Sequence, residues 1–451
     1  MMVGMAAEET HTKTRTRTRT RTGTQTGTTG RDPGTSEATR ALTGWPMRLL
    51  VVGIVLSAVN LRPAITSLGA LLEEVRDGLG MSGSVAGLLT SVPPLCFAVF
   101  GVTAPRLARR FGPAAVVCVG MAAIAAGLLV RPFAGSTPAF LAASALALMG
   151  IAVSNVLMPV IVKRWFPDRV GSMTGLYSMA LALGTSTAAA ATVPLTDALG
   201  GSWQTGLAVW SALAVAAVLP WIPFVRGGGA ASVEEAPARD AASGKAAHAR
   251  GEAGPARLRI TRSRTAWALA VFFGLQATAA YITMGWMAQV FRDAGVAAST
   301  AGVLLAVTMV MGVPLAFVIP RLATRLPQQG PIVLALGVCG LAGYAGLYFA
   351  PAGGAWAWAV LLGISNCSFP LALTMVGMRA RSGPGVAQLS AFAQSTGYLI
   401  SIPGPLLVGI LYQHTGGWGV PIALMAALML PQMAVGYLAG RDRTVEDEAA
   451  V

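Results

Sequence analysis

Arg62 has the clearest chemical implication, because it is the one formal charge that falls unambiguously inside an apolar stretch of the chain, within residues 59–67. An arginine is costly in hydrocarbon and cannot readily lose its proton. We therefore expect it to face a bundle interior or a wet cavity, where it would meet an anion or a dipole. In the alternative interpretation, the side chain extends along its helix to the headgroups, since Arg62 lies in the later part of the stretch.

The neighbours of Arg62 suit the binding of a planar anion or nitro group. Helical spacing places Arg62, Thr66 and Gly69 on one stripe, with Asn60 slightly to one side. Pro63 lacks a backbone donor and should disturb the helix, which frees a carbonyl near the level of Arg62. The guanidinium could then hold the solute by two parallel hydrogen bonds, with a hydroxyl and loosened backbone beside it.

Other polar side chains in apolar stretches are candidates to line the same cavity. Asn155 and Asn366 each precede a proline by four residues, at matching places in two stretches. Such amides either join helices by hydrogen bonds or contact the solute. The remaining candidates, for which packing is the alternative interpretation, are Tyr177, Gln276, Thr278, Tyr281, Thr283, Trp286, Gln289, Gln394, Tyr398 and Ser401.

Membrane-spanning helices must position these side chains. The 451-residue chain is 54% hydrophobic and only 11% charged, whereas a soluble protein carries roughly 25% charged residues. Apolar stretches of about 20 residues are long enough to cross a bilayer. We predict an all-α membrane protein with spans at 48–69, 84–104, 114–132, 138–162, 170–193, 204–224, 266–290, 299–320, 331–350, 355–377, 386–411 and 419–439. The first span should act as its own insertion signal, because the preceding residues are polar.

The charges of the short loops alternate along the chain and predict its orientation. One set of loops carries ten basic residues: Arg106, Arg109, Arg110, Lys163, Arg164, Arg169, Arg321, Arg325, Arg379 and Arg381. The other set carries three, Arg76, Arg131 and Arg292, together with Glu73, Glu74, Asp77 and Asp293. The positive-inside rule therefore places both termini and the 226–264 insertion in the cytoplasm. We expect the protein to lie in the plasma membrane. The first set is interpreted either as a cytoplasmic gate, chiefly at Arg106, Arg109, Arg110, Arg321 and Arg325, or as a topology marker.

The chain also repeats itself. Pro105-Arg106-Leu107-Ala108 recurs 215 positions later as Pro320-Arg321-Leu322-Ala323, and Asn155 and Asn366 differ by 211. Two six-helix halves in the same orientation constitute the major facilitator architecture. We expect a basic tail (1–46), the first half (47–225), a cytoplasmic linker (226–264), the second half (265–440) and a cytoplasmic C-terminal tail (441–451).

Two sets of residues carry a resemblance to known transporters. The segment Gly101-Val102-Thr103-Ala104-Pro105-Arg106-Leu107-Ala108-Arg109-Arg110 is similar to the facilitator loop motif Gly-x-x-x-Asp-Arg-x-Gly-Arg-Arg, but Pro105 and Ala108 depart from it. The segment Asn60-Leu61-Arg62-Pro63-Ala64-Ile65-Thr66-Ser67-Leu68-Gly69-Ala70-Leu71-Leu72 resembles the first helix of the cyanate and nitroimidazole transporter (CynX/NimT-like) family. Residues 158–166 and 175–178 resemble the same family around its fourth and fifth helices. The resemblance implies a carrier of small anions or nitro-bearing compounds.

Several other classes of function find little support. The basic tail contains no aromatic residue in its Thr-Arg tract on which a base could stack, so we expect contact with lipid and none with nucleic acid. No predicted span contains Asp or Glu, which leaves a carboxylate proton relay without support. The spans offer no nucleophile–base pair, and the four cysteines lack metal-ligand spacing, so we expect neither an enzyme nor a cofactor. We predict a monomeric secondary transporter of a small polar solute, with a broad-specificity multidrug exporter as the alternative.

Overall fold

The computed structural model describes residues 45–226 and 259–449, and every regular element within these ranges is helical. The predicted basic tail and most of the predicted linker therefore lie outside the described residues. The chain divides into a unit ending at Met47 and a unit that begins at Arg48, and the features described below belong to the second unit.

Twelve helices in the described residues are long and apolar enough to cross a membrane, as predicted. The first six spans are built from α2 (Trp45–Asn60), α3 (Pro63–Ala70), α5 (Gly83–Phe111), α6 (Pro113–Val130), η1 (Arg131–Phe133), α7 (Thr137–Trp165), α8 (Val170–Ala198), α9 (Trp203–Val218), η3 (Leu219–Trp221) and α10 (Ile222–Arg226). Two short helices, α4 (Leu72–Gly78) and η2 (Pro167–Arg169), lie in the connections.

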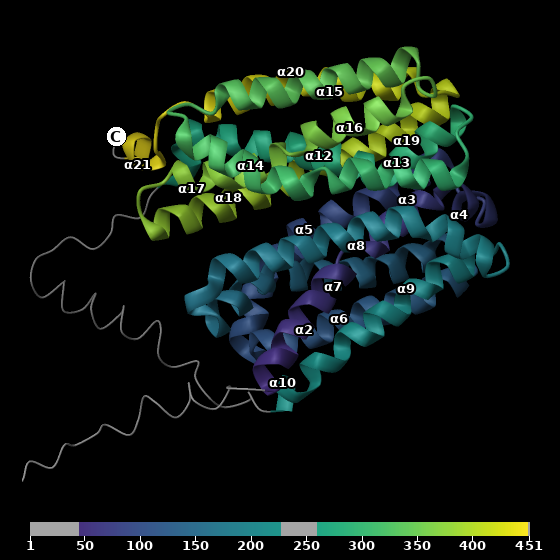
Figure 1. The fold of residues 1–451 in the computed structure, drawn as a ribbon, viewed down its shortest axis with the longest axis horizontal. Coiled ribbons are helices and arrows are strands. Elements are labelled where there is room, and N and C mark those ends of the chain that lie inside the picture. The colour runs from purple at the N-terminus through teal and green to yellow at the C-terminus, as the bar shows by residue number, and fades with distance from the viewer. Residues whose placement is uncertain (1–44, 227–258, 450–451) are drawn as a thin grey trace, which may run out of the picture. The chain divides into compact units, whose positions relative to one another are not determined.

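The last six spans use α12 (Arg264–Asp293), α13 (Ala298–Val310), α14 (Gly312–Arg325), α15 (Gly330–Phe349), α16 (Ala355–Asn366), α17 (Ser368–Met378), α18 (Gly383–Ser401), α19 (Pro403–Thr415) and α20 (Gly419–Ala439). The short helices η4 (Ile260–Arg262) and α21 (Val445–Ala449) flank them. Figure 1 shows the first six spans in purple to teal and the last six in green to yellow, as two bundles. We call them the N-terminal half and the C-terminal half.

The first span is broken at the predicted place. α2 ends at Asn60, and α3 begins at Pro63, which occupies the first helical position that proline favours. Because Pro63 has no N–H, the carbonyl of Val59 loses its normal helical donor. Gly184 of α8 packs directly against this carbonyl, and a side chain at that position would overlap it. The break therefore displays Arg62 at the junction of two half-helices.

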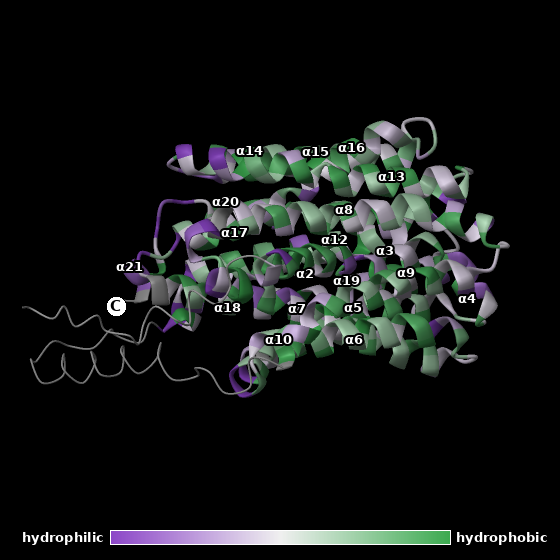
Figure 2. Ribbon diagram, turned by 60° about the horizontal axis from the view of Figure 1, so that its bottom comes forward, coloured by the Kyte–Doolittle hydropathy of each residue, from purple (hydrophilic) through white to green (hydrophobic). Residues whose placement is uncertain are grey.

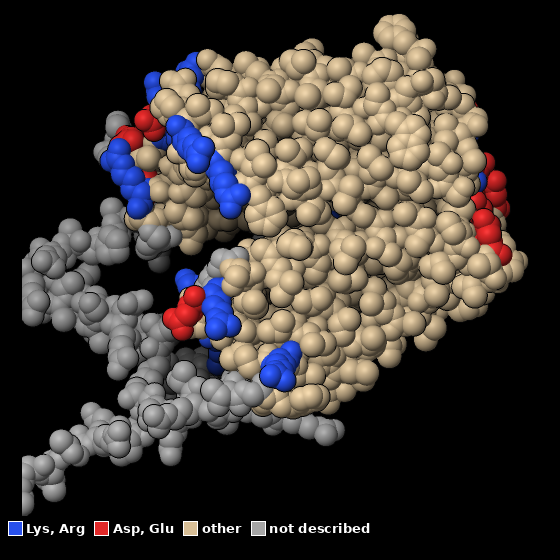
Figure 3. Space-filling view, viewed as in Figure 1, with Lys and Arg blue, Asp and Glu red and all other residues tan. Residues whose placement is uncertain are grey.

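The surface matches a protein that sits in a bilayer. Figure 2 shows hydrophobic residues along the length of the helices and hydrophilic residues at their ends. Large apolar side chains such as Val119 and Leu183 are exposed on the outside, where lipid would cover them. Figure 3 shows most of the basic side chains at one end, with a few acidic side chains among them, and a mainly acidic cluster at the other end. We call these the basic end and the acidic end.

Part of the predicted C-terminal tail is folded against the basic end. In α21, the Glu448 carboxylate accepts hydrogen bonds from the Ser263 hydroxyl (2.6 Å) and from the backbone N–H (3.0 Å) and hydroxyl (2.9 Å) of Thr265, which caps the start of α12. Burial alone would raise the pKa of Glu448, but these hydrogen bonds outweigh it and hold the pKa below its usual value. Glu446 similarly accepts hydrogen bonds from the backbone of Arg381 and Ser382 at the start of α18.

Two predicted loop cations prove to be buried. Arg379 is 2% exposed and donates to the carbonyls of Ala439 and Gly440 and to the side chain of Gln329. Arg131, predicted to lie in the opposite loops, is 1% exposed. Arg379 turns inward towards the uncapped carbonyls at the end of α20, and Arg131 turns inward towards the carbonyl of Ala64 and the hydroxyl of Ser67 in α3. These acceptors are distant in sequence, so the sequence does not reveal them.

Candidate functional site

A cavity of about 280 Å³ lies between the two halves, and Arg62 borders it. The N-terminal half also contributes α8, and the C-terminal half contributes α12, α13, α14, α16, α17 and α18. Most of the wall is apolar, with a few polar groups, as is usual for a small-molecule site. The lining residues are Arg62, Ser178, Leu181, Ala182, Thr185, Ala277, Ala280, Tyr281, Met284, Met309, Gly312, Ala316, Asn366, Cys367, Phe369, Pro370, Leu373 and Tyr398.

The charge of Arg62 has no counter-ion in the described part of the chain. None of its ion pairs involves Arg62, and no carboxylate borders the cavity. The guanidinium lies close enough to the hydroxyls of Tyr177, Tyr281 and Tyr398 to interact with them electrostatically. Hydroxyl dipoles compensate a cation only in part, so this cavity favours an anion or the negative end of a dipole.

Aromatic rings fix the two tyrosines that border the cavity with Arg62. The ring of Phe97 stacks on Tyr398 with centroids 5.1 Å apart and lies 6.5 Å from Tyr281. Phe273 packs edge-on against Tyr398 at 5.2 Å. Because these rings are mutually packed, the hydroxyls of Tyr281 and Tyr398 keep a defined position beside the guanidinium.

Two hydrogen-bonded amides support the cavity wall. Asn366, at the junction of α16 and α17, accepts a hydrogen bond on its side-chain oxygen from Gln276 (2.8 Å), and Gln276 in turn accepts one from Gln432 (2.9 Å). On the other side, the Tyr177 hydroxyl donates to Asn155 at 2.5 Å. Gln276 thus holds Asn366 in place, whereas Gln276, Asn155 and Tyr177 do not themselves border the cavity. Gln432 was not among the residues predicted from the sequence, although an amide in an apolar span could have indicated it.

Eight further sequence candidates do not border the cavity: Asn60, Thr66, Thr278, Thr283, Trp286, Gln289, Gln394 and Ser401. Asn60 is fully buried and directs its amide nitrogen at the sulfur of Met121. The Thr66 hydroxyl donates to the carbonyl of Arg62 at 3.2 Å. Gln394 donates to Ser390, and the Trp286 indole donates to Thr90 at 3.1 Å, close to the acidic end. Asn60 and Thr66 therefore support the helices around the break, Trp286 supports the contact between the halves, and Gln394 makes its hydrogen bond within α18.

The predicted gating arginines are exposed at the basic end. Arg106, Arg109 and Arg110 lie on the last turns of α5, which continues as a helix through the predicted loop, and Arg321 and Arg325 lie at the end of α14. Figure 3 shows that the two halves are separated by a hollow at this end. In the described residues none of these five side chains forms an ion pair.

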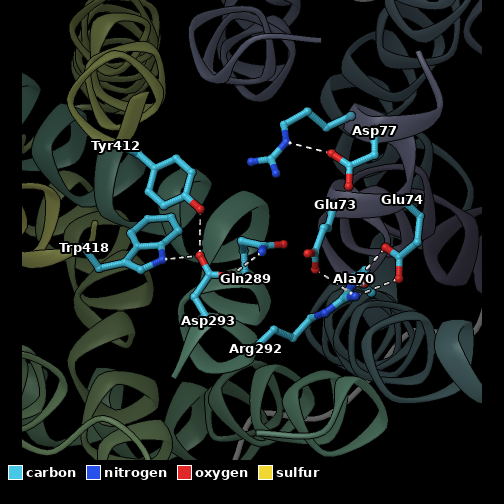
Figure 4. A network of polar contacts seen from close by, with 10 residues as sticks. Ala70, Glu73, Glu74, Asp77, Gln289, Arg292, Asp293, Tyr412 and Trp418 are labelled. Atoms are coloured by element: carbon cyan, nitrogen blue, oxygen red, sulfur yellow. Dashed lines mark hydrogen bonds and ion pairs between the residues drawn. The ribbon is translucent and has the colours of Figure 1, made fainter. Parts of the chain in front are cut away.

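Ion pairs connect the halves at the acidic end. Arg292, at the end of α12, donates to both carboxylate oxygens of Glu74 (3.0 and 2.8 Å) and lies 2.9 Å from Glu73 (Figure 4). Next to it, Asp293 accepts hydrogen bonds from Tyr412 (2.8 Å) and Trp418 (2.7 Å).

Close packing accompanies these ion pairs. A side chain at Gly69 of α3 would overlap the carbonyl of Met284 in α12, and one at Gly409 of α19 would overlap the carbonyl of Gly83 in α5. Gln413 also accepts hydrogen bonds from the backbone and hydroxyl of Ser84 (2.9 and 2.8 Å). The halves are therefore closed against each other at the acidic end and apart at the basic end.

Twelve spans in two halves around a central cavity define a membrane transporter. Residues 50–382 match the model of the Major Facilitator Superfamily, and the chain belongs to this superfamily. It is therefore a transporter, not an enzyme. Among solved structures, the D-xylose–proton symporter has a TM-score of 0.66 at 12% identity, covering 88% of this chain and 97% of that one. The peptide transporter POT has a TM-score of 0.67 at 16% identity, covering 90% and 98%.

Curated relatives confirm the resemblance seen in the first helix. The chain is 35% identical to the uncharacterized transporter YycB of Bacillus subtilis (strain 168), over 88% of this chain and 94% of that protein. It is 31% identical to the 2-nitroimidazole transporter of Escherichia coli (strain K12), over 90% and 98%. It is 28% identical to the cyanate transport protein CynX of the same strain, over 86% and 96%.

Proposed function

We propose that this transporter moves a small anionic or nitro-bearing polar solute, similar to cyanate or a nitroimidazole, across the plasma membrane by alternating access. Arg62 is the main residue that anchors the solute. The observation that carries this proposal is the guanidinium of Arg62, which borders the cavity between the halves without a counter-ion in the described residues. The names of two relatives agree with this class of solute.

The chemistry of the cavity supports the choice of solute. A nitro group presents two oxygens that a guanidinium can hold by parallel hydrogen bonds, and cyanate presents a negatively charged terminal atom that can accept hydrogen bonds from the same donors. The hydroxyls of Tyr281 and Tyr398 and the amide of Asn366 would supply the remaining donors. The otherwise apolar wall strengthens these hydrogen bonds by excluding water.

The orientation of the chain follows from its charges. We place the basic end, with both termini and the 226–264 linker, in the cytoplasm and the acidic end outside. In this orientation the structure is closed to the exterior and open to the cytoplasm. The halves, 47–225 and 265–440, would rock about the cavity, with the acidic end opening as the basic end closes. The arginines of α5 and α14 at the basic end are the proposed cytoplasmic gate, and the carrier acts as a monomer.

Uptake by cells that produce the full chain tests this proposal. Radiolabelled cyanate and 2-nitroimidazole are offered to the wild type and to the variants Arg62→Ala, Arg62→Lys and Arg443→Ala. We expect Arg62→Ala to abolish uptake and Arg62→Lys to retain little, because an ammonium lacks the planar pair of donors. Arg443 is an exposed arginine of the basic end outside the cavity, so its loss should leave uptake unchanged.

The multidrug alternative rests on the apolar part of the cavity wall. An exporter of bulky lipophilic compounds would not need Arg62. Export of ethidium that persists in Arg62→Ala, without cyanate or nitroimidazole uptake by the wild type, would favour the multidrug function over the proposed one.

A further inference from the structure

A second arginine is buried near the cavity. Arg131 lies in η1, at the end of α6, and is 1% exposed. Its Nη1 donates to the carbonyl of Ala64 at 2.9 Å and its Nη2 donates to the Ser67 hydroxyl at 3.4 Å, while its Nε has no hydrogen-bond partner. The ring of Phe140 lies 6.0 Å from the guanidinium carbon. No ion pair in the described residues includes Arg131.

An uncompensated cation in this place is expensive. An arginine keeps its proton in proteins, so burial leaves a full positive charge that two neutral acceptors satisfy only in part. A side chain that merely braced α3 against α6 could do so without a charge. The fixed charge and the idle Nε donor suggest that a further partner is bound at some stage.

A small cavity beside Arg131 offers a place for such a partner. It has a volume of about 10 Å³, the size of about one water molecule. Ser144 of α7 also borders it, is 1% exposed, and has a hydroxyl oxygen without a hydrogen-bond partner. Thr90 of α5 and Tyr281 of α12 complete the polar part of its wall. Two buried residues with unused hydrogen-bonding capacity thus border one cavity.

The small cavity adjoins the central one on the side of the acidic end. Tyr281 borders both cavities, and Ala64, which follows Arg62 by two residues, borders the smaller one. The walls of the small cavity come from both halves: α3, α5 and α7 from one, and α12 from the other. It is narrow in this structure because α3 and α12 pack tightly at Gly69. Separation of the halves at the acidic end would widen it.

We propose that Arg131 and Ser144 form a second anion-binding site, which the solute occupies between Arg62 and the acidic end. This inference rests on the proposed function of the transporter and adds a second binding site to the path of the solute. A small monovalent anion passes from one guanidinium to the next, so that it is never held in an apolar environment without a cation. Tyr281 borders both cavities, so its hydroxyl can donate a hydrogen bond to a solute at either site.

The site predicts a sidedness that a bracing role does not. A solute that enters from the acidic end meets Arg131 first, whereas a solute that enters from the basic end meets Arg62 first. Loss of the second site should therefore weaken apparent affinity mainly from the acidic end. Transport of radiolabelled cyanate is measured in intact cells, where the acidic end faces the medium, and in inverted membrane vesicles, where the basic end does.

Four variants separate the alternatives. Arg131→Gln should raise the half-saturating cyanate concentration about tenfold or more in intact cells. In inverted vesicles the same variant should change this concentration less than about twofold. Arg131→Lys should recover part of the affinity that Arg131→Gln loses in intact cells. Ser144→Ala removes a hydroxyl that has no protein partner, so it should fold normally and still raise the value in intact cells. Ser67→Ala removes a hydrogen-bond acceptor of Arg131 but not its charge, so it should lower thermal stability. It should leave unchanged the ratio of the half-saturating concentrations measured in intact cells and in inverted vesicles.

Four outcomes would overturn the second site. If Ser144→Ala behaves as the wild type does, or if Arg131→Gln is equally impaired from both sides, Arg131 has only a structural role. The proposed function still stands in either case, provided that Arg62→Ala abolishes transport. If the wild type carries neither cyanate nor 2-nitroimidazole, or if Arg62→Ala transports them normally, the proposed function fails and the second site fails with it.

Discussion

Replacement of Arg292 by glutamine should shift the transporter towards the state that is open at the acidic end. Arg292 joins the halves through a two-point contact with Glu74 and a further contact with Glu73. The side chain of Arg292 is 17% exposed and that of Glu74 is 34% exposed, so solvent screens the pair only in part. A charge-assisted hydrogen-bonded pair contributes about 1.5–3 kcal/mol when desolvated, and screening reduces this to about 1–2 kcal/mol. The ratio of the two states should therefore change by roughly 5- to 30-fold.

Distance measurements between spin labels across the acidic end would detect this shift. Cysteines are introduced at Ser136 and Ala352, exposed residues of the connections α6–α7 and α15–α16, after replacement of the natural cysteines. The population with the longer distance should grow in Arg292→Gln. The matched control is Arg381→Gln, which breaks an exposed pair with Asp447 inside the C-terminal half. An unchanged distance distribution in Arg292→Gln, or an equal shift in the control, would refute the assignment of this ion pair as the closure.

Two further predictions concern stability. Gly184→Ala should destabilise the chain by about 1–3 kcal/mol because the new methyl group would overlap the carbonyl of Val59, whereas Gly175→Ala, with open space around it, should not; equal thermal unfolding temperatures would contradict this. The pKa of Glu448 is lowered in the folded chain, so its contribution to the docking of α21 is present above its usual pKa of 4.5 and is lost as the pH falls through the lowered value. The protection factors of residues 445–449, which compare hydrogen exchange with its intrinsic rate at the same pH, should fall over that range in the wild type, and protection that does not change with pH would count against the docking contact. Glu448→Gln should show low protection throughout.

Hydropathy and charge predicted the architecture because the membrane imposes them on the sequence. The twelve spans followed from stretches of sufficient length, and Pro63 marked the break of the first helix because its missing N–H is a local property. The depth of each side chain between the acidic end and the basic end was harder to predict. Tyr281 and Trp286 lie five residues apart on α12, yet Tyr281 borders the cavity while Trp286 is enclosed near the acidic end. The depth at which the halves close depends on packing between helices that are distant in sequence.

Arg131 shows a second feature that the sequence alone does not predict, which is the direction of a side chain at the end of a span. A basic residue at the end of an apolar stretch looks the same whether it reaches outward to the headgroups or turns inward. The direction of Arg131 is set by acceptors at Ala64 and Ser67, more than 60 positions earlier in the chain. Only the fold reveals that these acceptors are adjacent, so the loop assignment of Arg131 was wrong for a reason that local sequence cannot correct.

Equilibrium binding tests the central role of Arg62 most directly, because it does not depend on the later steps of transport. Radiolabelled 2-nitroimidazole is titrated against the purified full chain and its Arg62→Lys and Arg62→Ala variants, with Arg443→Ala as the control. Loss of two charge-assisted hydrogen bonds should weaken binding by Arg62→Ala at least about tenfold, Arg62→Lys should recover little, and Arg443→Ala should bind as the wild type does. Wild-type affinity in Arg62→Ala would contradict the claim that this guanidinium holds the solute.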